Sequence, residues 1–210
     1  MSRKKDADKR QLILVEAKRM FASNGYEGTS MNGLAKKLGI SVGSLYTYFD
    51  SKETLMNTII EEGWNEFAGY LEKGLVSDAG PAIPADADAS LSKLAFLLRN
   101  ALPALFKDLD LIAILLAQAD STSHLKEKLE YLASLIAAII LDQNGKRIAP
   151  VKLTTLKAGL AVMLLGSLET LRLIHRAGID IEADDVIAFL VSSVEGALGC
   201  SLPGAFVPEG

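Results

Sequence analysis

The sequence predicts an all-helical protein, and three observations support this fold class. Apolar residues recur at three- and four-residue spacing along most of the 210 residues, as on the buried face of a helix. No segment shows the sustained alternation of apolar and polar residues that is typical of a half-buried strand. No glycine-rich phosphate loop follows a strand-like segment. The length suits either one small module plus one larger domain or one continuous helical body, and it is enough to bury a sizeable core.

The first helix is predicted to begin near Asp8, because Asp8 and Gln11 have the spacing of a capping box. Its apolar face comprises Ile13, Ala17, Met20 and Phe21. We expect this helix to be the scaffold that fixes the angle of the two helices after it. The basic residues at its start either lie along a polyanion or form a solvated, frayed terminus. They are Arg3, Lys4, Lys5, Lys9 and Arg10.

Residues 30–52 predict two short helices joined by a sharp turn. The first has one apolar face at i, i+3, i+4 and i+7, formed by Met31, Leu34, Ala35 and Leu38. Gly39 suits the left-handed conformation that ends a helix. Ser41 can cap the second helix, whose buried side consists of Leu45 and Phe49. This is the pattern of a helix-turn-helix, in which the second helix enters the major groove of DNA.

The outward side of the second helix has small residues first and hydroxyl-bearing aromatic residues later. They are Val42, Gly43, Ser44, Tyr46, Thr47 and Tyr48. Small groups permit close approach to base edges, and tyrosine hydroxyls suit phosphate oxygens. Asp50 or Ser51 caps the next helix, with Glu53 at capping-box spacing from Asp50. Lys52 then lies in the first turn, where a positive charge opposes the helix dipole, and a nearby phosphate would offset this. The alternative is an ordinary helical hairpin, which can contain the same turn at Gly39. The aromatic residues that follow the turn favour DNA binding.

The segment from about Lys9 to Ile60 resembles the DNA-binding domain of TetR-type transcriptional regulators and covers roughly a quarter of the chain. The residues that carry the resemblance are Ala17, Phe21, Gly25, Thr29, Leu34, Ala35, Leu38, Gly39, Ile40, Ser41, Gly43, Leu45, Tyr46, Phe49, Lys52, Glu53 and Leu55. The resemblance implies DNA contacts from Thr29, Ser41, Val42, Gly43, Ser44, Tyr46, Thr47, Tyr48 and Lys52. Of these, Tyr46, Tyr48 and Lys52 would touch phosphates. The family commonly has histidine where this chain has Tyr48, which reaches further.

Charge is divided unevenly along the chain. The formal net charge is −4, which by itself argues against nucleic acid. Residues 1–56, however, hold 10 Lys and Arg against 6 Asp and Glu, a net of +4. The remainder holds 12 against 20, a net of −8. The positive end therefore coincides with the predicted DNA-binding module, which we place at residues 1–52, with the helix-turn-helix at 30–49.

A larger helical domain is predicted from residue 53 to 210. A linking helix runs from Lys52 to about Gly74, and Pro, Gly and Asp make residues 77–90 a loop. Five further helices are expected at about 91–106, 109–119, 123–142, 151–177 and 183–199. Pro103 should kink or shorten the first of these. Asn144-Gly145 marks a turn, Pro150 can start a helix, and the last two helices would pair across Gly178.

The last two helices are the predicted dimer seam, because apolar positions on both are interspersed with small residues that permit close helix approach. The residues chosen for this interface are Met163, Gly166, Leu171, Phe189, Ser193 and Gly196. The alternative is that these residues face the core of their own chain. The resemblance implies a homodimer that places its two DNA-binding domains on a palindromic operator.

The resemblance also implies a ligand site among the middle helices, in a body rich in Leu, Ile and Ala that favours a small, largely apolar effector. The polar groups that could orient it are Asn100, Gln118, His124, Tyr131, Glu169 and Arg172, together with His175. Each also has a plain reading as a surface residue. We predict a repressor that such an effector releases from DNA. The alternative is a helical adaptor that binds a protein partner and has no small-molecule effector.

Other classes of protein lack support in the sequence. There is no metal-ligand spacing or nucleophile motif, so we expect no enzyme activity, cofactor or metal. The longest uncharged apolar runs, residues 131–141 and 158–168, have 11 residues each, short of the roughly 18 to 20 that span a bilayer. The basic N-terminus continues through Lys18 and Arg19, unlike a signal peptide. Cys200 is the only cysteine, which excludes an intrachain disulfide and suits a reducing compartment. We expect a cytoplasmic protein.

Overall fold

The computed structural model describes residues 2–76, 89–106, 108–117, 124–142, 153–177, 181–199 and 201–202. The regular secondary structure in these ranges is helical, and they contain no strand, which confirms the all-helical prediction. The chain forms two compact units. One comprises Met1–Glu66 with Asp110–Asp120, and the other comprises Phe67–Leu109 with Ser121–Gly210. The predicted domain division after residue 52 stays a prediction.

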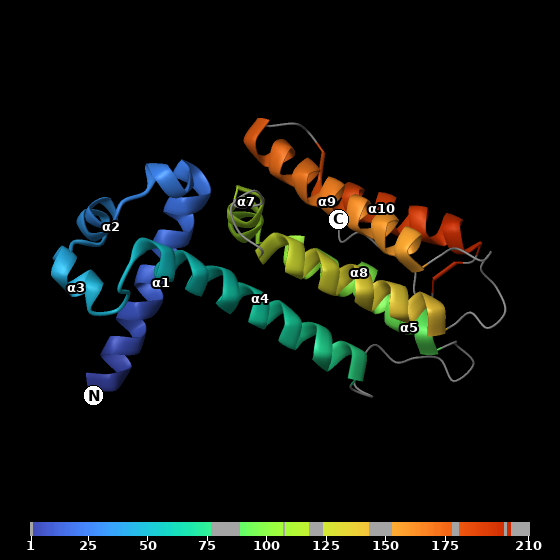
Figure 1. The fold of residues 1–210 in the computed structure, drawn as a ribbon, viewed down its shortest axis with the longest axis horizontal. Coiled ribbons are helices and arrows are strands. Elements are labelled where there is room, and N and C mark those ends of the chain that lie inside the picture. The colour runs from blue at the N-terminus through green and yellow to red at the C-terminus, as the bar shows by residue number, and fades with distance from the viewer. Residues whose placement is uncertain are drawn as a thin grey trace. The chain divides into compact units, whose positions relative to one another are not determined.

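The first unit contains α1 (Ser2–Gly28), α2 (Met31–Leu38), α3 (Val42–Tyr46), the first part of α4 (Lys52–Val76) and nearly all of α7 (Leu109–Ala117). Figure 1 shows α2 and α3 as two short helices beside the long α1. Gly25, with φ 72° and ψ 176°, interrupts the helical conformation of α1 before its last turn. The predicted start of α1 near Asp8 was wrong, because the helix begins at Ser2.

The core of the first unit is apolar and draws on each of these helices. Phe21 and Ile13 of α1, Leu34 of α2 and Leu45 of α3 are buried. The α4 contribution is Leu55, Met56, Ile59, Ile60 and Trp64, and that of α7 is Leu111, Ile112, Ile114 and Leu115. Met20 and Leu38, predicted on apolar faces, are only half-buried. A Cβ atom on Gly63 would lie 2.7 Å from a Leu111 methyl carbon, so glycine permits the close approach of α7 to α4.

The second unit contains the rest of α4 and the remaining helices. They are α5 (Ala89–Phe96), the π-helical segment η1 (Leu97–Ala101), α6 (Leu102–Phe106), α8 (His124–Asp142), α9 (Leu153–Ala177) and α10 (Ala183–Leu198). Helix α8 packs on α5 and α9, and α9 packs on α10 (Figure 1). The predicted helices agree with these bounds to within two residues, and Gly199 ends α10 in the left-handed conformation.

The break predicted at Pro103 takes the form of a π-helical turn. Leu102 donates its N–H to the carbonyl oxygen of Leu97, five residues earlier, and the helix continues to Phe106. Proline has no N–H to donate and its ring crowds the preceding turn, so a local widening is a common way to accommodate it. A partly buried ion pair, with 3.0 Å between Arg99 Nη2 and Glu195 Oε1, joins η1 to α10.

Several sequence predictions fall outside the described residues. They concern Gln118, Asn144-Gly145, Pro150, Gly178, Cys200, most of the predicted 77–90 loop and the side chains of His124, Arg172 and His175. In the part of the chain that is described, no helix is long and apolar enough to cross a membrane.

Candidate nucleic-acid interface

Both short helices have a capped N-terminus, and the caps predicted at Gly39 and Ser41 are present. Ser30 Oγ accepts the Gly33 N–H at 3.0 Å at the start of α2, and Gly39 ends that helix with φ 66°. Ser41 Oγ accepts the Ser44 N–H at 3.1 Å and starts α3. These interactions satisfy backbone groups that a helix end leaves unpaired, so the turn has one conformation and α3 a fixed direction.

The second helix is shorter than predicted, because α3 ends at Tyr46 with Thr47 as its C-cap, three residues before the expected end at Phe49. The segment from Val42 to Phe49 still has the predicted outward and inward sides. Leu45 and Phe49 are buried, whereas Gly43, Tyr46 and Thr47 are exposed. Val42, Ser44 and Tyr48 are half-buried. A Cβ atom on Gly43 would have nothing within 4 Å, so the fold itself does not require glycine at this position. A glycine that packing does not require is consistent with the close approach of another molecule.

Thr29 has an inward role. Its side chain is 2% exposed, and its hydroxyl donates toward the carbonyl oxygens of Met20 at 3.1 Å and Gly25 at 2.9 Å. A hydroxyl buried in this way holds the chain between α1 and α2 and is not available to DNA. We therefore remove Thr29 from the set of contacts expected from the resemblance.

Lys52 also has partners within the protein. Its Nζ donates to the carbonyl oxygens of Tyr26 at 2.7 Å and Thr29 at 3.1 Å. The same nitrogen lies 3.9 Å from the centroid of the Tyr26 ring. Of the two caps predicted for α4, Ser51 fills the role, because its Oγ accepts the Thr54 N–H at 2.9 Å. An ammonium has three N–H groups, so one remains for a phosphate, and this contact stays a prediction.

The start of α1 adds residues that sequence spacing did not associate with α3. Lys9 Nζ donates to Ser44 Oγ at 2.8 Å and lies 5.6 Å from the centroid of the Tyr48 ring. The Tyr48 hydroxyl donates to Asp6 Oδ1 at 3.4 Å. Burial and the Asp6 carboxylate raise the pKa of Tyr48, so its phenol stays a hydrogen-bond donor at neutral pH. The available sequence signal was the basic character of this terminus, which did not specify the partners.

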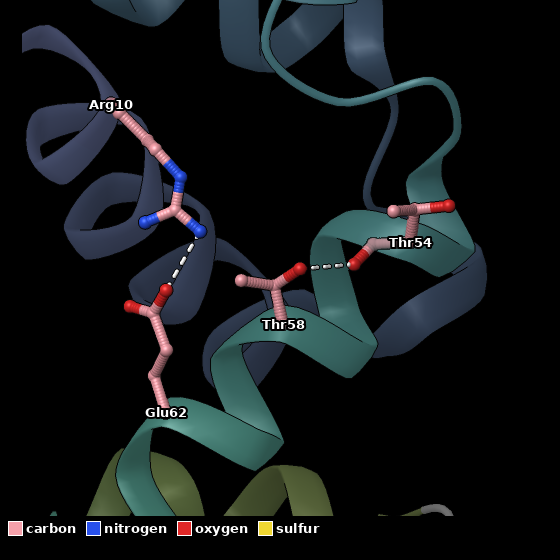
Figure 2. Close-up of polar contacts among 4 residues, drawn as sticks. All are labelled: Arg10, Thr54, Thr58 and Glu62. Carbon is pink, nitrogen blue, oxygen red and sulfur yellow. Dashed lines mark hydrogen bonds and ion pairs between the residues drawn. The ribbon is translucent and has the colours of Figure 1, made fainter. Parts of the chain in front are cut away.

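Ion pairs hold α1 against its neighbours. Arg10 Nη2 lies 2.7 Å from Glu62 Oε1 of α4, and its guanidinium carbon lies 5.4 Å from the centroid of the Phe49 ring. Figure 2 shows Arg10 directed toward Glu62. Glu62 lies on α4 together with Thr54 and Thr58. Lys37 of α2 lies 2.9 Å from Glu16 of α1. The Arg10–Glu62 pair is exposed and adds little stability, whereas Glu16 of the second pair is largely buried. The two pairs join α1 to α4 and to α2.

The residues predicted for a ligand lie in varied environments. Asn100 on η1 and Tyr131 on α8 are exposed, and Glu169 on α9 is half-buried. The remaining three, Gln118, His124 and Arg172, have no described side chain. The ligand assignment therefore stays a prediction.

The residues predicted for a dimer interface divide in two. Phe189 is 71% exposed, Gly166 and Gly196 are exposed, and Met163 and Ser193 are half-buried. Leu171 is only 3% exposed and packs in the core of its own chain, so we leave it out of the interface. Val162, Leu165 and Leu173, which the prediction did not include, add exposed apolar surface to α9.

A capped helix-turn-helix with an exposed second helix and lysines nearby defines the class of helix-turn-helix DNA-binding proteins. Residues 13–59 match the family model described as "Bacterial regulatory proteins, tetR family". The N-terminal domain therefore matches the tetR family model, as the resemblance in the sequence indicated. The relatives below are named as transcriptional regulators, in agreement with the expectation that the chain is not an enzyme.

Two relatives illustrate the sequence similarity. The regulator YfiR of Bacillus subtilis is 39% identical over 71 residues, which are 33% of this chain and 35% of YfiR. The negative regulator IcaR of the Staphylococcus epidermidis biofilm operon icaADBC is 32% identical over 59 residues, which are 28% of this chain and 32% of IcaR. The chain therefore spans about a third of the length of these relatives.

Two solved structures share the fold over most of the chain. The ketosteroid transcriptional regulator KstR2 of Mycobacterium tuberculosis has a TM-score of 0.67 at 19% identity, covering 90% of this chain and 94% of KstR2. FadR of Bacillus subtilis, solved in complex with stearoyl-CoA, has a TM-score of 0.63 at 21% identity, covering 89% of this chain and 96% of FadR. At this identity the similarity concerns the fold.

Proposed function

We propose that this protein is a transcriptional regulator that binds double-stranded DNA through α3 and the start of α1. The observation that supports this most directly is the exposure of Gly43 and Tyr46 on α3 and of its C-cap Thr47. Leu45, on the opposite side of the same helix, and Phe49, just after it, are buried. Ser44 and Thr47 face the bases, and Tyr46 and the remaining N–H of Lys52 contact phosphates. Tyr48 contacts a phosphate by giving up its 3.4 Å hydrogen bond to Asp6. The family match to residues 13–59 supports the same reading.

The regulator acts as a homodimer on a palindromic operator. Val162, Leu165 and Leu173 of α9 and Phe189 of α10 expose large apolar side chains. Gly159 and Gly166 of α9 have open space at the Cβ position, so backbones could approach closely there. Exposed apolar residues on neighbouring helices are typical of a surface that a second chain covers. A two-fold dimer presents two copies of α3 to two half-sites about one helical turn apart.

The regulator is a repressor that a small, largely apolar effector releases from DNA. The core of the second unit consists mainly of Leu, Ile, Ala and Phe side chains, which would line an apolar site. The similarity of fold to FadR, which was solved with stearoyl-CoA, supports an effector with a long apolar part. The effector lowers DNA affinity if it binds better to the conformation that fits DNA less well.

Selection of random double-stranded DNA by the purified protein at near-physiological salt tests the proposal. We expect an enriched palindrome with half-sites about one helical turn apart. A single unpaired motif would contradict the dimer, and no enrichment would contradict sequence-specific DNA binding and favour the adaptor. Titration of the bound operator with acyl-CoA of increasing chain length then tests the effector. Release by long chains only is expected, and no release by any chain contradicts an acyl-type effector.

A further inference from the structure

Ser44 and Thr47 differ in what their hydroxyl groups can offer to DNA. Ser44 lies on α3, and Thr47 is the C-cap of the same helix. Because the two residues are three positions apart, their side chains lie on the same side. A hydroxyl has one proton to donate and two lone pairs that accept. The interactions inside the protein use a different part of each hydroxyl. Base recognition in the major groove depends on this difference, because each base edge has a distinct pattern of donors and acceptors.

The Ser44 hydroxyl keeps its proton. Lys9 Nζ donates to Ser44 Oγ at 2.8 Å, and an ammonium has no lone pair with which to accept in return. The remaining Ser44 bonds involve its backbone, whose N–H donates to Ser41 Oγ and whose carbonyl accepts from Thr47. Among the described residues nothing accepts the Ser44 hydroxyl proton. The neighbouring positive charge also favours an electron-rich acceptor over another donor.

The Thr47 hydroxyl has the opposite polarity. Its Oγ1 donates to the Ser44 carbonyl oxygen at 2.7 Å, so its proton is already used inside the helix. The side chain is exposed and retains lone pairs and a methyl group for an outside partner. It can therefore accept from an exocyclic amine or touch a thymine methyl group, but it does not offer a proton.

We infer that Ser44, oriented by Lys9, reads a base acceptor as a hydrogen-bond donor, while Thr47 reads an adjacent exocyclic amine as an acceptor. Guanine is the preferred partner of Ser44, because its major-groove edge has two acceptors, N7 and O6, and no donor. Adenine N6 or cytosine N4 is the partner of Thr47. Lys9 is then a positioning residue for specificity as well as a positive charge. This inference rests on the proposed binding of DNA by α3.

The test compares base preferences, measured by selection from random double-stranded DNA, for the wild type, Ser44→Ala, Lys9→Met and the double variant. We expect one guanine position per half-site to lose about 5- to 30-fold of its preference in Ser44→Ala. Lys9→Met should relax the preference at the same position, and the double variant should lose no more than Ser44→Ala. Lys36→Met, which removes an exposed positive charge from α2, is the control and should weaken binding without changing base preference.

Chemical substitution of the DNA gives a second readout. Replacing the selected guanine by 7-deazaguanine removes N7, and this should weaken the wild type but leave Ser44→Ala unaffected. Thr47→Val keeps the shape of the side chain and should relax the preference for an amine at the adjacent position, whereas Thr47→Ser should retain it. The folded state of each variant is checked by circular dichroism and thermal unfolding.

The outcomes separate the inference from the proposed function. If the wild type enriches no sequence, sequence-specific binding is wrong and the inference is wrong with it. If the wild type enriches an operator but Lys9→Met weakens all sequences equally, Lys9 is a phosphate contact and only the inference is wrong. An unchanged guanine preference in Ser44→Ala would overturn the assignment of that base to Ser44.

Discussion

The ammonium of Lys52 lies 2.7 Å from the carbonyl oxygen of Tyr26 and 3.9 Å from the centroid of the Tyr26 ring. Tyr26 follows Gly25, where the chain leaves the helical conformation, and from the backbone its carbonyl oxygen accepts the Thr29 N–H at a long 3.3 Å. The first residue of α4 thus fixes the segment between α1 and α2 through a charge-assisted hydrogen bond and a cation–π contact. Lys52 therefore has a structural role whether or not it touches DNA.

Substitution of Lys52 by alanine should lower the free energy of unfolding by about 1–3 kcal/mol, because two part-buried carbonyl groups lose a charged donor. Urea unfolding measures this, with Lys36→Ala on the exposed side of α2 as a control that should change little. Unchanged stability of Lys52→Ala would contradict the structural role.

The salt dependence of operator binding by Lys52→Ala decides the predicted phosphate contact. Loss of one phosphate contact should make the slope of log K against log salt shallower by about 0.9. A lower affinity with an unchanged slope would mean that Lys52 acts only by holding the segment between α1 and α2. A change in sequence preference alone would contradict both roles.

Gly43→Ala should separate folding from DNA binding. Because a Cβ at this position has open space around it, alanine should leave the stability unchanged or raise it by up to about 1 kcal/mol through helix propensity. Operator affinity should fall, since the methyl group occupies the side of α3 that approaches the bases. Thermal unfolding and a binding titration on the same sample measure the two effects, and unimpaired binding would contradict close approach at Gly43.

The sequence predicted the helix-turn-helix well because its signals are local. Gly39 and Ser41 act on backbone groups within five residues, and each has the predicted capping role. The burial of Leu45 was predicted from its position on α3, and Phe49 is also buried although α3 ends at Tyr46. The bounds of the main helices of the second unit were predicted for the same reason, from the spacing of apolar residues and from glycine or proline near the helix ends.

Contacts between distant segments could not be predicted in this way. Lys9 meets Ser44 across 35 positions, and Lys52 meets Tyr26 across 26, so no spacing rule connects them. The contact of Asp6 with Tyr48 at the start of α1 spans 42 positions and could not be predicted from spacing either. The inward direction of Thr29 depends on the carbonyl groups of Met20 and Gly25, which α1 brings within reach of the Thr29 hydroxyl.

Phe21→Ala should destabilise the protein by about 3–5 kcal/mol, because the ring is buried and stacks with that of Tyr26 at 6.0 Å between centroids. Such a loss would appear as lost DNA binding, so the unfolding free energy is measured first. Phe21→Leu retains much of the volume and should cost less than half as much. A cost below 1 kcal/mol for Phe21→Ala would show that the site collapses around the cavity.

Gly74→Ala should be destabilising, in contrast to Gly69→Ala on the same helix. A Cβ atom on Gly74 would collide with the buried ring of Phe96, whereas one on Gly69 would have open space. We expect a cost of about 1–3 kcal/mol at residue 74, from displacement of the ring, and no cost or a small gain at residue 69. Thermal unfolding of the pair measures the difference, and equal effects would contradict the packing of α4 on α5.

Phe189→Asp should convert the proposed dimer into a monomer. The side chain is 71% exposed in the single chain, so the substitution should not harm the fold of α10. In a dimer covered by α9 and α10 it would bury an unpaired carboxylate, which is strongly unfavourable. Sedimentation velocity at micromolar protein concentration measures the mass. Binding to a palindromic operator should weaken in parallel, because the two DNA-binding domains are no longer joined in one particle.

Leu12→Asp is the matched control, because Leu12 is 63% exposed but lies on α1. It introduces the same charge in place of a similarly exposed apolar side chain and should leave the mass of the particle unchanged. If both variants stay dimeric, the dimer uses a surface other than the one formed by Val162, Leu165, Leu173 and Phe189. If the wild type is itself monomeric at these concentrations and on its operator, two-fold recognition is wrong, and the apolar residues of α9 and α10 must be covered by a different partner.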